Sequence, residues 1–120
     1  MTYLYIFLGG GLGSLARYLT TKGASAIFTT NFPLGTFISN MLACLILALL
    51  VIFISNKQEA FSWLQPLLII GFCGGFSTFS TFSNETVTLM NDGYFGVAIA
   101  NIVISVVVGV GLIWFLRVKG

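Results

Sequence analysis

The sequence predicts an all-α integral membrane protein whose four transmembrane helices fill the whole chain, residues 1–120, as one domain. Only 7% of the 120 residues are charged, whereas a soluble domain carries about a quarter. The mean hydropathy of the chain is +1.05. Four apolar segments are each long enough to cross about 30 Å of hydrocarbon, and short links join them. No stretch is left over for a soluble domain.

The remaining composition excludes several classes of function. The formal net charge is only +2 and there is no basic run, so no nucleic-acid partner is expected. The chain has no histidine and no CxxC pair, and Cys44 and Cys73 both fall in apolar segments. They are predicted to be small buried hydrophobes rather than zinc or redox ligands. Since the sequence offers no set of nucleophile, base and acid, the chain is not predicted to be an enzyme.

The apolar segments are predicted as helices at about residues 3–24, 34–55, 64–90 and 94–116. No Lys or Arg precedes the first apolar run, which favours a retained span over a secretory signal. The links contain breakers or polar residues: Asn31-Phe32-Pro33, Ser55 to Ser62 and Asn91-Asp92-Gly93. Such short links force an up-down order, which puts both chain ends and the 55–62 link on one side of the membrane.

The positive charges give almost no orientation. Lys57, Arg117 and Lys119 lie on the side of the chain ends, and Arg17 and Lys22 lie on the opposite side. This bias is too small for the positive-inside rule to decide between two orientations. The chain is therefore predicted to insert both ways, with a modest preference for the terminal side inside as the alternative.

The stretch from Gly71 to Glu85 interrupts the third segment near the membrane midplane. Gly74 and Gly75 have no Cβ and are predicted to leave helical geometry there. Five hydroxyls follow them, interleaved with three phenylalanines: Ser77, Thr78, Ser80, Thr81 and Ser83. A helix broken at membrane depth is tolerated only where protein or a wet cavity satisfies the freed backbone groups. This stretch is the leading candidate site.

The break predicts ion-binding groups of both signs. Carbonyls at the end of the first half-helix can coordinate a bare alkali cation, and the start of the second half-helix favours an anion. Phe79 and Phe82 share one helix face, where their ring edges can contact an anion or pack in a core. The hydroxyls can donate to an anion or bond back to the preceding turn. Asn40 can bind an anion or join helices.

Polar groups gather in the half of the membrane opposite the chain ends. Arg17, which shares a face with Gly9 and Gly13, is either an anion entrance or an interfacial anchor. The face of Asn101, Ser105 and Gly109 either extends a polar track or mediates packing. Such a half-path would be completed by an inverted second copy, so an antiparallel homodimer is predicted; a lipid-facing dead end is the alternative.

The residues GFCGGFSTFSTFSNE (71–85) closely resemble the third-helix signature of the small bacterial fluoride channels (Fluc, also called CrcB). GGGLGSLARY (9–18) and GTFISN (35–40) support the resemblance, and the four-span layout covers the whole chain. Three positions depart from the family's usual pattern: Ser77 where Thr is common, Ala43 where Gly is usual, and Asn101 where an aromatic residue is frequent.

The resemblance implies a passive fluoride-selective channel in the bacterial inner membrane that exports cytoplasmic fluoride and relieves its toxicity. It implies an antiparallel, dual-topology homodimer with two fluoride pathways and one central structural sodium ion. The implied pathway residues are Asn40, Phe79, Phe82, Thr81 and Ser105, with Arg17 in the vestibule. The backbone carbonyls of Gly74 and Ser77 would bind the sodium.

Two other functions compete with the channel. A proton-coupled four-helix exporter matches in size, but such exporters use an acidic residue deep in the first helix, and residues 3–24 contain no Asp or Glu. A non-transporting scaffold subunit does not need a helix broken at the midplane. The channel is therefore the preferred hypothesis.

Overall fold

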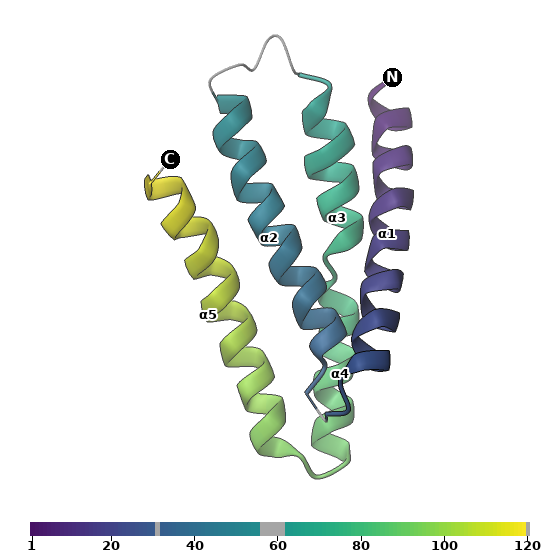
Figure 1. Cartoon of the computed structure of the whole chain (residues 1–120), viewed down its shortest axis with the longest axis vertical. Coiled ribbons are helices and arrows are strands. Elements are labelled where there is room, and N and C mark those ends of the chain that lie inside the picture. The colour runs from purple at the N-terminus through teal and green to yellow at the C-terminus, as the bar shows by residue number, and fades with distance from the viewer. Residues whose placement is uncertain (31, 56–61, 120) are drawn as a thin grey trace.

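The computed structural model describes residues 1–30, 32–55 and 62–119, and all regular structure within these ranges is helical. The helices run up and down along the long axis (Figure 1). Their bounds are α1 Thr2–Ile27, α2 Leu34–Ser55, the π-helix η1 Gln65–Cys73, α3 Gly74–Phe76, α4 Phe79–Asn91 and α5 Phe95–Lys119. The predicted all-helical class is confirmed.

The observed bounds follow the predicted segments closely. α1 and α5 each continue about one turn beyond the expected ends at 24 and 116. Gly93 adopts a positive φ of 88° directly after α4, as a tight turn requires. Both chain ends lie at one end of the bundle together with the facing ends of α2 and η1 (Figure 1), as predicted. Asn31 and Lys57 lie outside the described residues.

Three helical stretches are long and apolar enough to cross a membrane: Leu34–Ser55, Gln65–Asn91 and Phe95–Lys119. They identify a multi-pass membrane protein. The 26 residues of α1 give it sufficient length, but its glycines and Arg17 make it less apolar. A fourth span in α1 therefore stays a prediction.

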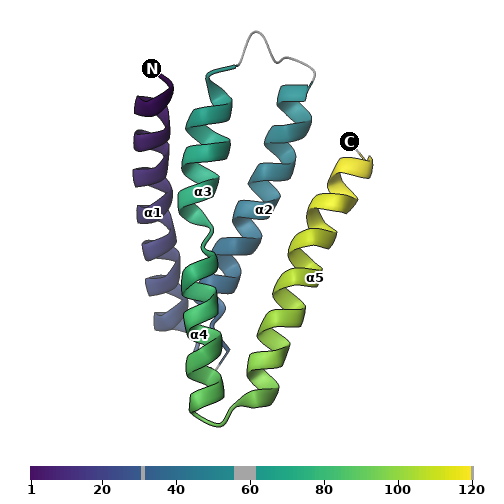
Figure 2. The same cartoon turned by 180° about the vertical axis from the view of Figure 1, so that it is seen from behind.

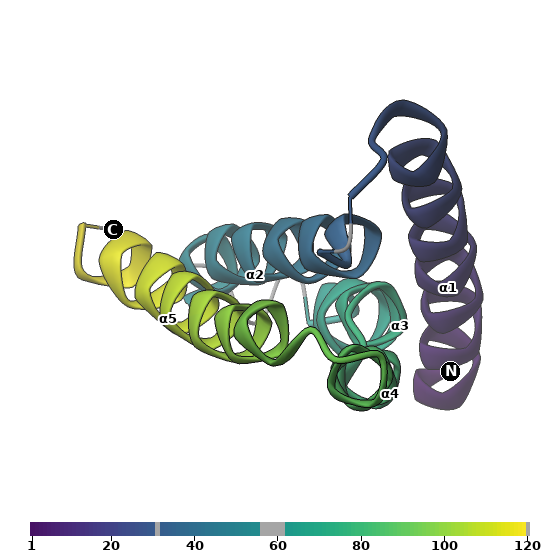
Figure 3. The ribbon, with the colours of Figure 1, turned by 90° about the horizontal axis from the view of Figure 1, so that it is seen from below.

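The segment formed by η1, α3 and α4 lies at the centre of the bundle and changes partners along its length. η1 and α3 pack against α1, whereas α4 packs against α5. Seen from below, α3 and α4 lie between α1 on one flank and α2 with α5 on the other (Figure 3). The view from behind shows the central segment passing from α1 towards α5 at the interruption between α3 and α4 (Figure 2).

Glycines allow α1 to approach the central segment at backbone distance. A Cβ added to Gly9 would overlap the Leu67 carbonyl oxygen, and one added to Gly13 would overlap the Phe72 carbonyl oxygen. Small residues permit this close packing in membrane helices. The packing predicted from the four-residue spacing in the first segment is confirmed.

The helix break lies three residues beyond its predicted position. Gly74 is helical, with φ −63° and ψ −37°, and α3 continues to Phe76. The interruption is formed by Ser77 (φ −85°, ψ 156°) and Thr78 (φ −153°, ψ 124°). These extended conformations are open to any residue, so the break needs no glycine. Gly75 serves helix packing instead, because a Cβ there would lie 2.5 Å from the Gly10 oxygen.

Candidate functional site

A cavity of about 340 Å³, here called the groove, opens beside the helix break. Three elements and the break line it, with Asn40 from α2, Ser77 and Thr78 from the break, Phe79 and Phe82 from α4, and Ser105 from α5. Four of the five residues predicted for an anion pathway therefore come together. The fifth, Thr81, is not part of the lining; its backbone N–H donates to the Thr78 hydroxyl at 3.2 Å.

Asn40 binds the backbone of the break with both ends of its amide. Its Oδ1 accepts from the Thr78 N–H at 2.7 Å, and its Nδ2 donates to the Thr78 carbonyl at 3.3 Å. The helix-joining role is therefore observed, and it satisfies peptide groups that the break removes from the helix. Because a primary amide carries two N–H donors, one remains for the groove that Asn40 lines.

The first hydroxyls of the Ser/Thr stretch organise the break itself. The Ser77 hydroxyl donates back to the Cys73 carbonyl at 2.7 Å, so the back-bonding alternative is correct for Ser77. The Thr78 hydroxyl accepts from the Thr81 N–H and caps α4. This cap satisfies one of the N–H groups left free at the start of a helix.

Phe79 and Phe82 pack against each other along one face of α4. Their ring centroids are 6.0 Å apart and the planes are tilted by 42°. The Phe79 ring is 79% exposed, so within this chain the core-packing alternative is wrong for it. Both rings line the groove.

Arg17 contacts the end of α3. Its Nε donates to the Gly75 carbonyl at 3.1 Å, one of the carbonyls left without a helical partner where the helix stops. A positive charge also suits the negative end of the helix dipole. This contact ties α1 to the break. The two alternatives for Arg17, an anion entrance and an interfacial anchor, and the vestibule role implied by the resemblance, stay predictions.

The predicted face of Asn101, Ser105 and Gly109 divides into three environments. Asn101 is buried away from the groove, Ser105 lines the groove with its hydroxyl, and Gly109 lines it where α5 packs against α2. A Cβ on Gly109 would lie 3.4 Å from the Met41 methyl and 3.5 Å from the Cys44 sulfur.

Both thiols are free, but they differ in burial. Cys73 is buried as predicted. Cys44 is half-buried and lines the groove, where its sulfur faces Gly109 of α5. The prediction of a buried hydrophobe is wrong for Cys44.

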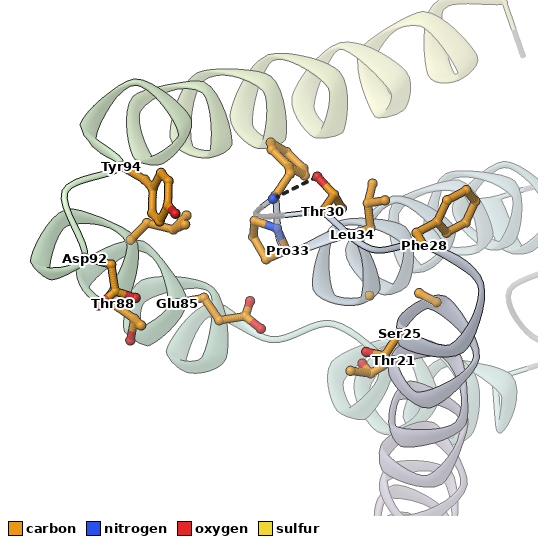
Figure 4. A pocket seen from close by; sticks show the side chains of 14 residues that line it. Thr21, Ser25, Phe28, Thr30, Pro33, Leu34, Glu85, Thr88, Asp92 and Tyr94 are labelled. Carbon is orange, nitrogen blue, oxygen red and sulfur yellow. Dashed lines mark hydrogen bonds between the residues drawn. The ribbon is translucent and has the colours of Figure 1, made fainter.

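A second cavity of about 390 Å³, the end cavity, lies where the α1–α2 and α4–α5 links meet (Figure 4). Hydroxyl and carboxyl groups line it, among them Thr21, Ser25, Thr30, Thr88, Glu85 and Asp92. Sequence reasoning missed this cavity. The signal was present, because hydroxyls recur near the ends of the first and third segments.

Glu85 points from α4 towards the start of α2 (Figure 4). Its carboxyl group lies close enough to the Thr36 side chain to interact with it, whereas Oε1 is buried without a hydrogen-bond partner among the described residues. The expectation that Glu85 meets a polar group is correct.

The backbone of the break leaves two carbonyls that suit a bare cation. Ser77 N–H, Arg17 and Asn40 occupy the carbonyls of Cys73, Gly75 and Thr78. Among the described residues, neither the Gly74 carbonyl nor the Ser77 carbonyl accepts any of the backbone hydrogen bonds that form outside the regular helices. A Cβ on Gly74 would meet nothing within 4 Å, so this position faces open space. Such hard oxygen donors are chemically suited to a bare alkali cation.

Comparison with known proteins settles the family. Residues 4–116 match the family described as "CrcB-like protein, Camphor Resistance (CrcB)". The chain belongs to the CrcB family. The predicted resemblance is thus confirmed for nearly the whole of this CrcB chain.

Several CrcB relatives carry the name "Fluoride-specific ion channel FluC". The relative from Flavobacterium psychrophilum is 40% identical over 113 residues, which cover 94% of this chain and 91% of its own. The relative from Phocaeicola vulgatus is 43% identical over 107 residues, or 89% and 88%. The relative from Solibacter usitatus is 36% identical over 115 residues, or 96% and 94%. These names describe ion channels, and the prediction that the chain is not an enzyme is confirmed.

Proposed function

We propose that this chain is a passive, fluoride-selective channel through which cytoplasmic fluoride leaves the cell and its toxicity is relieved. The observation that carries the proposal is the groove, where Asn40, Phe79, Phe82 and Ser105 meet beside a broken helix. The names of the relatives support fluoride as the ion.

The groove offers what a small, strongly hydrated anion needs. Fluoride leaves water only where close donors replace its hydration shell, and a narrow path supplies them best. Asn40 has one N–H that Thr78 does not use, and Ser105 supplies a hydroxyl. The Phe79 and Phe82 rings add positive edges, which attract anions without a full positive charge that would trap them.

The functional unit proposed here is an antiparallel homodimer in the bacterial inner membrane, with α1 as the fourth span. A second copy would cover surfaces that one chain leaves open, above all the ring of Phe79 and the backbone at Gly74. Inversion is supported by the small charge bias, with Arg17 and Lys22 opposite Arg117 and Lys119. A cysteine introduced at Lys119 should be labelled from both sides of the membrane, and labelling from one side alone would contradict inversion.

We infer that one sodium ion, structural rather than transported, joins the two copies at their breaks. Each copy would contribute the Gly74 and Ser77 carbonyls, which gives four oxygens around a shared centre. The positive charge of the ion would balance the partial negative charge at the two α3 ends. Replacing sodium by N-methylglucamine at constant ionic strength should lower the melting temperature of the purified dimer. An unchanged melting temperature in sodium-free buffer would argue against the ion.

Liposomes that hold the purified protein and are loaded with fluoride or chloride test the function. Valinomycin supplies the potassium counter-current, and no pH gradient is imposed. The proposal expects rapid fluoride loss with chloride retained. If fluoride stays inside until a proton gradient is applied, the channel proposal fails and a proton-coupled exporter takes its place.

Phe82→Ile should reduce fluoride efflux at least tenfold while the dimer still assembles, because isoleucine keeps apolar bulk but has no positive ring edge. The matched control is Phe115→Ile on α5, an exposed ring that does not line the groove. It should leave efflux unchanged. Equal efflux from both variants would remove the Phe82 ring from the pathway.

A further inference from the structure

Asn101 on α5 connects two groove residues although it is not in the groove itself. It is 1% exposed, so an ion in the groove does not touch it. Its Oδ1 accepts from the Ser105 hydroxyl at 3.4 Å, and its Nδ2 donates to the Thr86 hydroxyl at 3.0 Å. The Thr86 hydroxyl donates to the Phe82 carbonyl at 2.8 Å. The network therefore links a groove hydroxyl on α5 to the turn of α4 that carries a groove ring.

The direction of each hydrogen bond in this network follows from its donors. Thr86 has a single hydroxyl proton and gives it to the Phe82 carbonyl, so it can only accept from Asn101. The amide nitrogen of Asn101 must therefore face Thr86, and the amide oxygen faces Ser105. Ser105 is left as a donor to that oxygen.

Ser105 differs from other hydroxyls in or next to the helices. Five of them donate to a backbone carbonyl three or four residues earlier, over 2.7–2.9 Å: Thr20, Ser55, Ser77, Thr86 and Thr88. This is the common arrangement for such residues. Ser105 instead donates to a side chain over 3.4 Å, well beyond the usual O–H···O distance. Its proton is held loosely.

We propose that Asn101 is a positioning residue for the fluoride pathway, which keeps the Ser105 proton available to an anion in the groove. This inference rests on the proposed function. When fluoride reaches Ser105, the hydroxyl rotates and donates to the ion, and the Asn101 oxygen loses only a long hydrogen bond. No covalent bond changes. Without the Asn101 amide, the hydroxyl bonds to the backbone carbonyl of residue 101, and fluoride has to compete with that shorter bond.

A double-mutant cycle on fluoride efflux from liposomes tests this role, with Asn101→Leu, Ser105→Ala and the combined variant. Leucine keeps the branched shape of Asn101 with the same number of side-chain heavy atoms, and it removes both hydrogen bonds. Each single variant should slow efflux about tenfold and raise the half-saturating fluoride concentration, as expected for the loss of one hydrogen bond to a charged ligand. The combined variant should be no slower than Ser105→Ala, because Asn101 acts through that hydroxyl.

A second double-mutant cycle tests the same role without a substitution at Asn101. Thr86→Val removes the acceptor that orients the amide, and it should also slow efflux in the parent protein but not in the Ser105→Ala background. Thr20→Val removes a back-bonded hydroxyl from α1 and serves as the control with parental efflux. If Asn101→Leu does not assemble, the Thr86→Val cycle decides alone.

Two results would overturn the inference. In the first, the reductions of fluoride efflux multiply in the combined variants, which would mean that Asn101 or Thr86 acts independently of Ser105. The other is parental efflux and half-saturation in an assembled Asn101→Leu protein. A parent protein that carries no fluoride at all would instead overturn the proposed function, so the two failures are distinguishable.

Discussion

Asn40→Asp should abolish measurable fluoride efflux. An ionised carboxylate about 4 Å from a passing anion opposes it by about 4 kcal/mol at an effective dielectric constant of about 20, which corresponds to roughly a thousandfold slower passage. The substitution also removes the Nδ2 donor to the Thr78 carbonyl, and it turns two oxygens towards the break. Efflux from liposomes at saturating fluoride measures the loss.

The control for Asn40→Asp is Asn91→Asp, which makes the same chemical change at the exposed end of α4. It should leave efflux within about twofold, since exposed charges are screened over about 10 Å at moderate salt. Efflux from Asn40→Asp equal to that from Asn91→Asp would take Asn40 out of the pathway. Size-exclusion chromatography separates protein that is folded but blocked from protein that is misfolded.

Gly13→Ala should prevent assembly of the folded protein. Its Cβ would overlap the Phe72 carbonyl oxygen and lie 2.8 Å from the Phe76 nitrogen, and backbone atoms cannot turn aside as side chains do. Overpacking of this kind costs about 1–3 kcal/mol or more, and here it would separate α1 from the central segment. The measurements are the yield of monodisperse protein and its melting temperature.

Gly11→Ala, two residues before Gly13 on the same helix, should not lower the stability of the protein as Gly13→Ala does. A Cβ there meets nothing within 4 Å, and alanine in a helix is favoured over glycine by about 1 kcal/mol. We expect an unchanged or higher melting temperature. Equal destabilisation by both variants would show that α1 tolerates no side chain on either face, contrary to the observed packing.

The sequence predicts the helices well because their signals are local. Apolar length, the turn at Gly93 and the small-residue face around Gly13 all depend on neighbours in the chain. The same reasoning puts the break at Gly74, because glycine is the usual residue for leaving a helix. The actual break, at Ser77 and Thr78, uses backbone angles open to every residue, so no residue type marks it.

The sequence predicts those parts of the candidate site that depend on the chemistry of single side chains, and not those that depend on partners elsewhere in the chain. The chemistry of the phenylalanine rings and of the Asn40 amide allows an anion path beside core packing and helix joining, and the family resemblance favours the anion path. The partners of the polar groups were out of reach: Arg17 binds a carbonyl 58 residues away, and Asn40 binds one 38 residues away. Asn101 stayed ambiguous for the same reason, because its partner Thr86 belongs to another helix.

The two-sided attachment of the break bears on how ions would pass. Arg17 of α1 holds the Gly75 carbonyl near the end of α3, and Asn40 of α2 holds Thr78, so the interruption is clamped between two neighbours. A transporter that alternates between inward and outward states has to move such an element on every cycle, over microseconds to milliseconds. A clamped interruption suits a stationary conduit, whose current rises in proportion to the electrochemical driving force and reverses with it.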